Sequence, residues 1–213
     1  MDSKEIAMEA LTLASVQHNY LYKYSSDASY TKPPSRGTKS VLDLLIKIAK
    51  DKRFDDLSKD IDFGNMEEMM TTHQDLILEY WNELEFSDPV KDFETCQKAA
   101  VLLFITSVNP ESHDYNFFIV HLLTSNYAVR VLLPFFPVQY HISLVRQWWL
   151  LAIVVFVLKG RPCPRPEVMN NEVKGRDWKY MEDKALNSAF RDDAHYVKGT
   201  SFAVWVRHVK ISR

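Results

Sequence analysis

The feature that most constrains the fold is the apolar run WWLLAIVVFVL at residues 148–158. It lies within a longer stretch, 137–159, that begins at a proline and ends just before Gly160, so it predicts one long helix. The run is shorter than the roughly 18 apolar residues that a membrane span needs, which favours a helix buried inside a protein. A helix that is apolar on all sides must be surrounded by other elements. We therefore predict a multi-helix array around a single core, as part of a larger helical domain.

The rest of the chain also predicts helices and no strand. Only 5 glycines occur in 213 residues, and no segment alternates apolar and polar residues as a half-buried strand would. Asp88 and Pro89 mark one helix start. The helix at the N-terminus is expected to bury Ile6, Leu11, Leu13 and Val16. The expected helices span residues 2–22, 38–51, 66–86, 88–108, 112–133, 137–159 and 177–189, with another from Asp193 and a loop at 24–37.

Composition and charge argue against several classes of function. The formal net charge of -2 gives no electrostatic reason to expect a nucleic-acid or anionic-membrane partner. The sequence holds no Gly-rich dinucleotide fingerprint, no P-loop and no flavin motif. The two cysteines, Cys96 and Cys163, form no metal knuckle or disulfide framework, and the N-terminus does not resemble a signal peptide. We expect a cytoplasmic protein without a membrane span that takes a small-molecule partner, and its oligomeric state stays open.

A histidine in an apolar helix is the first candidate for chemistry. His121 lies in HDYNFFIVHLLTSNYAVRVLLP, residues 113–134, one turn after Phe117 and Phe118. One interpretation is a core histidine that is hydrogen-bonded to a neighbouring hydroxyl or carbonyl. The other is a base or metal ligand that faces an aromatic pocket. His73 also lies on an apolar stripe, where a structural role is favoured.

The second candidate is the stretch DDAHYVKG, residues 192–199. Asp193 is suited to cap a helix, which would place His195 and Lys198 three residues apart on one face. On an exposed helix start these residues would have no special role. On a buried face the pKa of the lysine would fall, and the amine would act as a base or take up carbon dioxide to become an oxygen-donor metal ligand. The residues alone leave both interpretations open.

Several stretches, taken together and in order, resemble the fungal questin oxidase-like family. They are KEIAMEALTLAS (4–15), SHDYNFFIVHLLTSNYAVRVLLP (112–134), HISLVRQWWLL (141–151), KGRDWKYMEDKAL (174–186) and DDAHYVK (192–198). The resemblance implies an oxidoreductase of secondary metabolism that acts on aromatic polyketides. It implies a Baeyer–Villiger-type oxidative ring opening of an anthraquinone or related compound with dioxygen, with NADPH as co-substrate. Some members resemble non-haem Fe(II) oxygenases, which agrees with the absence of a flavin motif.

The resemblance also implies the site residues. His121 and His195 would be imidazole metal ligands or catalytic groups, and Lys198 would be a base or a carbamylated ligand. His113 is a weaker candidate. The aromatic residues that would wall a pocket for a flat tricyclic substrate, or else belong to the core, are Phe117, Phe118, Trp148 and Trp149.

Two differences between this chain and the family lead to an alternative hypothesis for its function. Family members carry a longer N-terminal portion with further histidines, and they have an alanine-rich helix where this chain reads GTSFAVWVRHVKISR. We expect residues 1–198 to form a partial questin oxidase-like helical domain and residues 199–213 to form a divergent tail. The alternative is a catalytically inactive, truncated family member that acts only as a helical binding scaffold.

Overall fold

Helices make up the regular structure of the described residues, which are 3–16, 19–34, 36–57, 65–107, 116–165, 177–197 and 199. In these residues the computed structural model shows no strand, and its β-type backbone pairing is an isolated bridge between Thr38 and Leu84. The all-α prediction is therefore confirmed. The α-helices are α1 Lys4–Val16, α2 Tyr22–Ser26, α3 Val41–Lys50, α4 Met66–Thr72, α5 Gln74–Glu83, α6 Pro89–Thr106, α7 Phe117–Leu132, α8 His141–Leu158 and α10 Trp178–Asn187, followed by a helical turn at 194–197.

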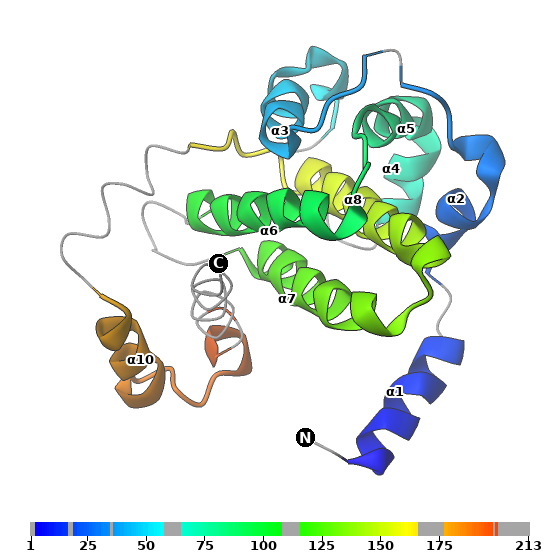
Figure 1. The fold of residues 1–213 in the computed structure, drawn as a ribbon. Helices are drawn as coiled ribbons and strands as arrows, with labels where there is room; N and C mark the ends of the chain where they lie inside the picture. Colours follow the sequence, from blue (N-terminus) through cyan, green and yellow to red (C-terminus); the bar gives the residue numbers. More distant parts are fainter. Residues whose placement is uncertain are drawn as a thin grey trace.

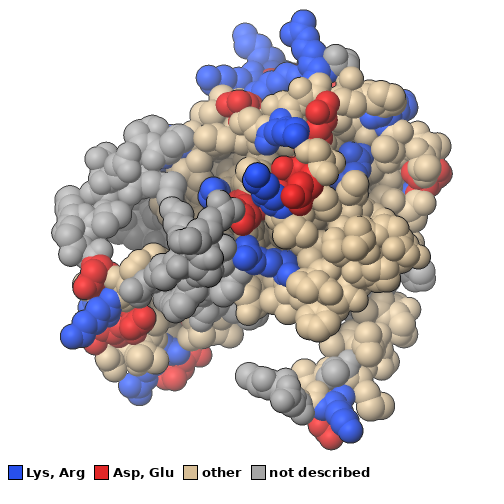
Figure 2. Space-filling view, viewed as in Figure 1, with Lys and Arg blue, Asp and Glu red and all other residues tan. Residues whose placement is uncertain are grey.

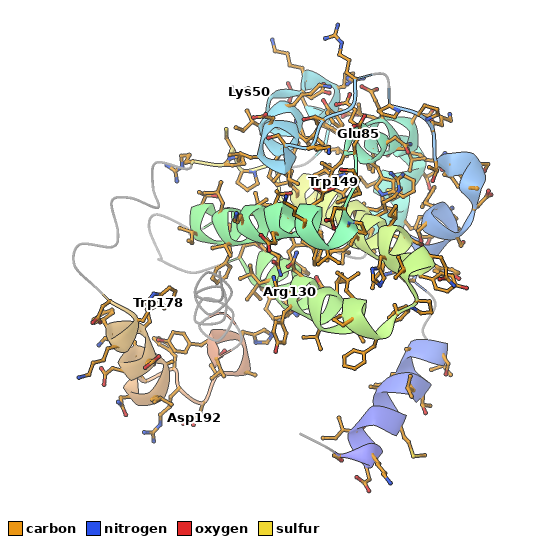
Figure 3. The ribbon with its side chains drawn as sticks, in the orientation of Figure 1. Lys50, Glu85, Arg130, Trp149, Trp178 and Asp192 are labelled. Carbon is orange, nitrogen blue, oxygen red and sulfur yellow. The ribbon has the colours of Figure 1, made fainter. Side chains whose placement is uncertain are left out.

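The central helix of the body is α8. It contacts α2, α4, α5, α6 and α7, and every residue from Ala152 to Leu158 is buried. Figure 1 shows α6 and α7 along one side of α8, with α3, α4 and α5 above it. Trp149 points into the middle of this body in Figure 3 and is completely buried. The prediction of a core helix over the apolar run is confirmed.

Two segments are long and apolar enough to cross a membrane by length and composition alone. They are Phe117–Phe135, whose apolar window is 33% buried within the protein, and Val138–Leu158, whose window is 67% buried. The higher burial of the second segment is typical of a core helix in a packed protein. The turn between the two helices leaves a corner of the body without charged side chains in Figure 2. The exposed apolar residues of this corner are Leu132, Phe135, Phe136, Val138, Tyr140 and Ile142.

Side-chain caps and one glycine set the helix ends. The Asp88 carboxylate accepts a hydrogen bond from the Lys91 backbone N–H at 3.1 Å, and Pro89 takes the first helical position of α6, as predicted. The Ser40 hydroxyl accepts from the Asp43 N–H at the start of α3. Gly160 ends α8 with φ 74°, a left-handed conformation that glycine adopts without a Cβ clash. These local signals explain why several helix boundaries could be predicted.

The N-terminal helix differs from the prediction. The structure ends α1 at Val16 and begins α2 at Tyr22, so a single helix over 2–22 is wrong. The expected buried side is also wrong, because the described side chains of α1 are mostly exposed. Ile6, Leu11, Leu13 and Val16 are all at least half exposed. Figure 1 shows the reason: α1 projects from the body instead of packing on it. The loop expected at 24–37 likewise starts later, since α2 continues to Ser26.

The helix expected over 66–86 is interrupted at His73. The backbone of His73 has φ -118° and ψ 19°, outside the helical range, and it separates α4 from α5. Its ring is held from both sides, because Nε2 lies 3.0 Å from an Asp56 carboxylate oxygen and Nδ1 lies 2.9 Å from the Thr72 hydroxyl. The ring also stacks on Phe54. The contacts with Asp56 and Phe54 come from tertiary packing, so the helical spacing of the sequence does not indicate the break.

The side chain of Asn82 on α5 forms hydrogen bonds with all of its polar atoms and joins α5 to the loop before α3 and to α8. The Asn82 side-chain oxygen accepts from the Lys32 backbone N–H at 3.1 Å and from the Arg146 guanidinium at 2.9 Å. Its nitrogen donates to the carbonyls of Tyr30 and Leu78. The Arg146 guanidinium lies 3.9 Å from the centre of the Trp81 ring, and burial lowers its pKa. This network fixes the loop before α3 on α5 and α8.

Candidate functional site

His121 and His195, the two candidate histidines that lie within the described residues, are side by side. His121 projects from α7 and His195 from the helical turn 194–197, and their ring centroids are 5.6 Å apart. Phe117 lies against both rings, at 4.6 Å from His121 and 4.7 Å from His195. Three rings from two separate segments therefore converge on one surface of the molecule.

Helix caps bring these side chains to one place. The Asn116 side chain accepts hydrogen bonds from the N–H groups of Phe118 and Ile119, which fixes the first turn of α7. Phe117 and His121 are then four residues apart and share one face of the helix. The Asp193 carboxylate accepts from the N–H groups of His195 and Tyr196 at 2.8 Å each, as the sequence predicted for a cap. The cap sets the position from which His195 reaches α7.

The hydrogen bond of His121 decides which of its nitrogens is available. Nδ1 lies 2.7 Å from the carbonyl oxygen of Phe117, and a carbonyl can only accept. The proton of the neutral ring is therefore on Nδ1, and the lone pair is on Nε2. No hydrogen bond to Nε2 occurs among the described residues. A histidine fixed in this tautomer presents Nε2 as a base or as a metal ligand.

The ring of His195 lies beside a carboxylate instead of a carbonyl. Its Nδ1 lies 4.0 Å from an Asp193 carboxylate oxygen, and its side chain is 41% exposed. Hydrogen bonds from the backbone N–H groups of Tyr196 and His195 lower the pKa of Asp193 and keep it anionic. The 4.0 Å separation is longer than a hydrogen bond, and the same Asp193 oxygen already accepts from two backbone N–H groups, so this contact does not fix a proton on Nδ1 of His195. His121 is therefore the histidine of the pair whose free nitrogen is set by a hydrogen bond.

The spacing of the two rings suits a shared metal ion. With metal–nitrogen bonds of about 2.1 Å, two imidazoles on one metal place their centroids roughly 5–6 Å apart. The observed 5.6 Å lies within this range. In the part of the chain that the structure describes, no third His, Cys, Asp or Glu joins them to complete a set of three. The pair could supply at most two ligands to a metal, fewer than the three that a non-haem iron usually takes from the protein.

The family assignment follows from a comparison with family models. The model described as questin oxidase-like matches residues 1–200, nearly the whole chain. This chain belongs to the questin oxidase-like family. No curated protein matches it, and no solved structure matches it. The family resemblance seen in the sequence stretches is thereby confirmed, and the family name indicates a related oxidase function.

Two other residues proposed for the site of this questin oxidase-like chain, Lys198 and His113, lie outside the described residues. Phe118 lies beside Phe117, and the Lys159 ammonium is 4.0 Å from the centre of its ring. This contact between α7 and the end of α8 was not expected, because residues so far apart in sequence leave no spacing signal. The two tryptophans belong to the core: Trp149 is completely buried and Trp148 donates to the Ser125 hydroxyl at 3.2 Å.

Proposed function

We propose that this chain is an oxidoreductase of the questin oxidase type, which opens a ring of an anthraquinone or related aromatic polyketide with dioxygen. The observation that carries the proposal is the convergence of His121 and His195 beneath Phe117 in a chain of this family. Two imidazoles next to a partly exposed aromatic ring, one of them with an available Nε2 atom, are suited to a flat phenolic substrate. Phe117 offers the stacking surface and the histidines offer proton transfer.

His121 is the residue we assign to proton transfer. A hydroxyanthraquinone carries phenolic hydroxyl groups, and removal of a phenolic proton by Nε2 of His121 makes the ring electron-rich enough to be oxidised. The Phe117 carbonyl on Nδ1 stabilises the imidazolium that forms. In the overall reaction one oxygen atom of dioxygen is inserted beside a carbonyl. The other leaves as water with two electrons from NADPH and two protons.

Fe(II) would be held by His121 and His195, with Lys198 as the further ligand that we expect from the sequence. When bound, the iron would supply the activation of dioxygen. Nε2 of His121 has one lone pair and cannot bind iron and take a proton at the same time, so proton transfer by His121 belongs to the reaction without iron. Phe117 orients the substrate ring in both cases. NADPH enters as a co-substrate that family resemblance implies.

Iron binding and turnover of the same protein test this function. The chain is loaded with ferrous iron under anaerobic conditions, and bound iron per chain is measured by elemental analysis beside a His121→Ala/His195→Ala double variant. Oxygen uptake and product mass are then followed with a dihydroxyanthraquinone, NADPH and ¹⁸O₂. We expect near-stoichiometric iron, lost in the double variant, and a product that gains one labelled oxygen atom. Val131→Ala, an exposed change elsewhere on α7, is the control and should keep both properties.

The outcomes separate the oxidase from the scaffold. Iron binding without oxygen uptake would contradict the oxidase and favour the catalytically inactive scaffold. Turnover without iron would support the oxidase function and assign the chemistry to the substrate and His121 alone. If the double variant turns over as fast as the wild type, the histidine pair is not the site.

A further inference from the structure

A second cluster of polar groups surrounds a cavity on another part of the molecule. The cavity has a volume of about 420 Å³ and is lined by residues of α2, of the segment before it and of the α4–α5 junction. A volume of this size is in the range of small-molecule sites. Figure 1 places α2 and α4 on the opposite side of the body from the turn 194–197. The cavity is therefore separate from the histidine pair.

The lysine at this cavity has no anionic partner among the described residues. The Lys23 ammonium donates to the Tyr20 hydroxyl at 3.0 Å, and it lies 4.1 Å from the centre of the Tyr20 ring and 4.8 Å from that of Tyr24. No carboxylate of the described residues forms an ion pair with it. A cation held by a hydroxyl and two ring faces keeps its full charge. It is thus available to an anionic ligand.

A row of hydrogen bonds orients the neighbouring groups. The Tyr24 hydroxyl donates its single proton to the Gln74 side-chain oxygen at 2.9 Å, and burial raises the pKa of Tyr24 to about 12, so this proton stays in place. The Tyr20 oxygen already accepts from Lys23 and lies 3.4 Å from the Tyr24 oxygen. The hydrogen bond from Lys23 lowers the pKa of Tyr20, which makes its hydroxyl a stronger donor.

Three donors therefore border the cavity. They are the Lys23 ammonium, the Gln74 amide nitrogen and the Tyr20 hydroxyl. The Gln74 oxygen is taken by Tyr24, and its nitrogen has no partner among the described residues. Because the Tyr24 proton goes to Gln74, the Tyr20 proton fills the long 3.4 Å contact with Tyr24 and turns from it to serve a ligand. Asp75 also lines the cavity and is the one carboxylate among its lining residues. A ligand that fits this set has one carboxylate for the three donors and a hydroxyl that can donate to Asp75.

We propose that the cavity between α2 and the α4–α5 junction is a second binding site, which takes a small organic acid with one carboxylate and one hydroxyl group. Lys23, Tyr20 and Gln74 bind the carboxylate, and Asp75 accepts from the hydroxyl. The Asp75 charge also excludes ligands with a second anionic group at that end, because two like charges close together repel. The site does not depend on the oxidase function proposed for the histidine pair.

Binding of three related probes to the full chain tests this proposal. Calorimetric titration at pH 7 compares 4-hydroxybenzoate, benzoate and the neutral 4-hydroxybenzamide. We expect 4-hydroxybenzoate to bind most tightly, benzoate more weakly and the amide weakest, since it lacks the charge that Lys23 recognises. Lys23→Gln should weaken 4-hydroxybenzoate binding at least about tenfold, and Tyr20→Phe should weaken it about threefold or more.

Two controls share the chemistry of these substitutions without lining the cavity. Tyr22→Phe changes an exposed hydroxyl on α2 itself, and Lys32→Gln removes an exposed positive charge nearby in sequence. Both should bind the probe within about twofold of the wild type. The proposal is overturned if 4-hydroxybenzoate does not bind, if the amide binds as tightly as the acid, or if Lys23→Gln and Tyr20→Phe bind like the controls. Unchanged circular dichroism of each variant shows that its fold is intact.

Discussion

The two cysteines of the chain lie in opposite environments. Cys96 is buried in α6, where burial raises the pKa of its thiol, and Cys163 is exposed after α8. Because the thiolate is the reactive form, Cys96 should be inert in the folded protein. We expect a maleimide to modify one thiol per chain under native conditions and two after denaturation, as counted by mass spectrometry. Native labelling that persists in Cys163→Ser would show that Cys96 is accessible after all.

Asp51 gives the chain a predictable response to acid. Hydrogen bonds from the Arg53 guanidinium hold the pKa of Asp51 far below its usual range, and the Tyr80 hydroxyl donates to the same carboxylate at 2.6 Å. The folded pKa is lower than the unfolded value of about 3.9, so Asp51 stabilises the fold above that pH. This contribution is lost as the pH falls below about 4 toward the folded pKa.

The substitution Asp51→Asn tests this linkage. It removes the charge and keeps an oxygen to accept from the Arg53 backbone N–H, as Asp51 does at 2.9 Å. We expect the variant to lose roughly 1–3 kcal/mol of unfolding free energy at pH 7, and the difference from the wild type to shrink between pH 5 and pH 3. Urea unfolding at several pH values measures both. A difference that stays constant over this range would mean that the charge of Asp51 is not what stabilises the fold.

At the scale of elements, one arginine joins the ends of two helices. Arg161 follows Gly160 with φ 53°, and its backbone N–H donates to the Phe156 carbonyl at 3.0 Å. Its guanidinium donates to the carbonyls of Asp51 and Phe54 at 2.7 and 3.2 Å and to an Asp55 carboxylate oxygen at 3.2 Å. A cation beside the last turn of α3 also interacts favourably with the helix dipole. The contact fixes α3 on the end of α8.

We expect Arg161→Ala to lower the unfolding free energy by about 2–4 kcal/mol, because several acceptors lose their donor together. Arg161→Lys should restore only a small part, since an ammonium cannot reproduce the fork of the guanidinium. Arg165→Ala, which changes an exposed arginine of the same loop, is the control and should stay within about 0.5 kcal/mol of the wild type. Full rescue by lysine would show that charge alone is sufficient.

At the scale of the whole molecule, stability is expected to be uneven. The core cluster includes buried residues of α2 to α8, whereas α10 has no buried residue and the described side chains of α1 are partly or largely exposed. Helices without buried apolar contacts open at little cost in free energy. Hydrogen exchange followed by mass spectrometry should therefore show slow exchange in α8 and fast exchange in α1 and α10. Equal protection of α1 and α8 would mean that α1 packs against something in solution.

The sequence by itself determined the helical class, the central helix and several helix boundaries. The periodicity of 137–159, the Asp88–Pro89 start and Gly160 are local signals, and a helix is a local structure whose hydrogen bonds close within a few residues. The same reasoning found Asp193 as a cap and selected His121 and His195 as candidates. Their roles as base or metal ligands stay predictions.

Only the tertiary structure decided which apolar residues are buried and which side chains meet. The apolar positions of α1 look like a buried side in the sequence, but burial depends on a partner surface, which α1 lacks among the described residues. The break at His73 comes from contacts with Asp56 and Phe54. The 5.6 Å between His121 and His195 and the Lys23–Tyr20–Gln74 cavity arise where separate segments pack. Such distances are set by the whole fold, because no spacing along the chain encodes them.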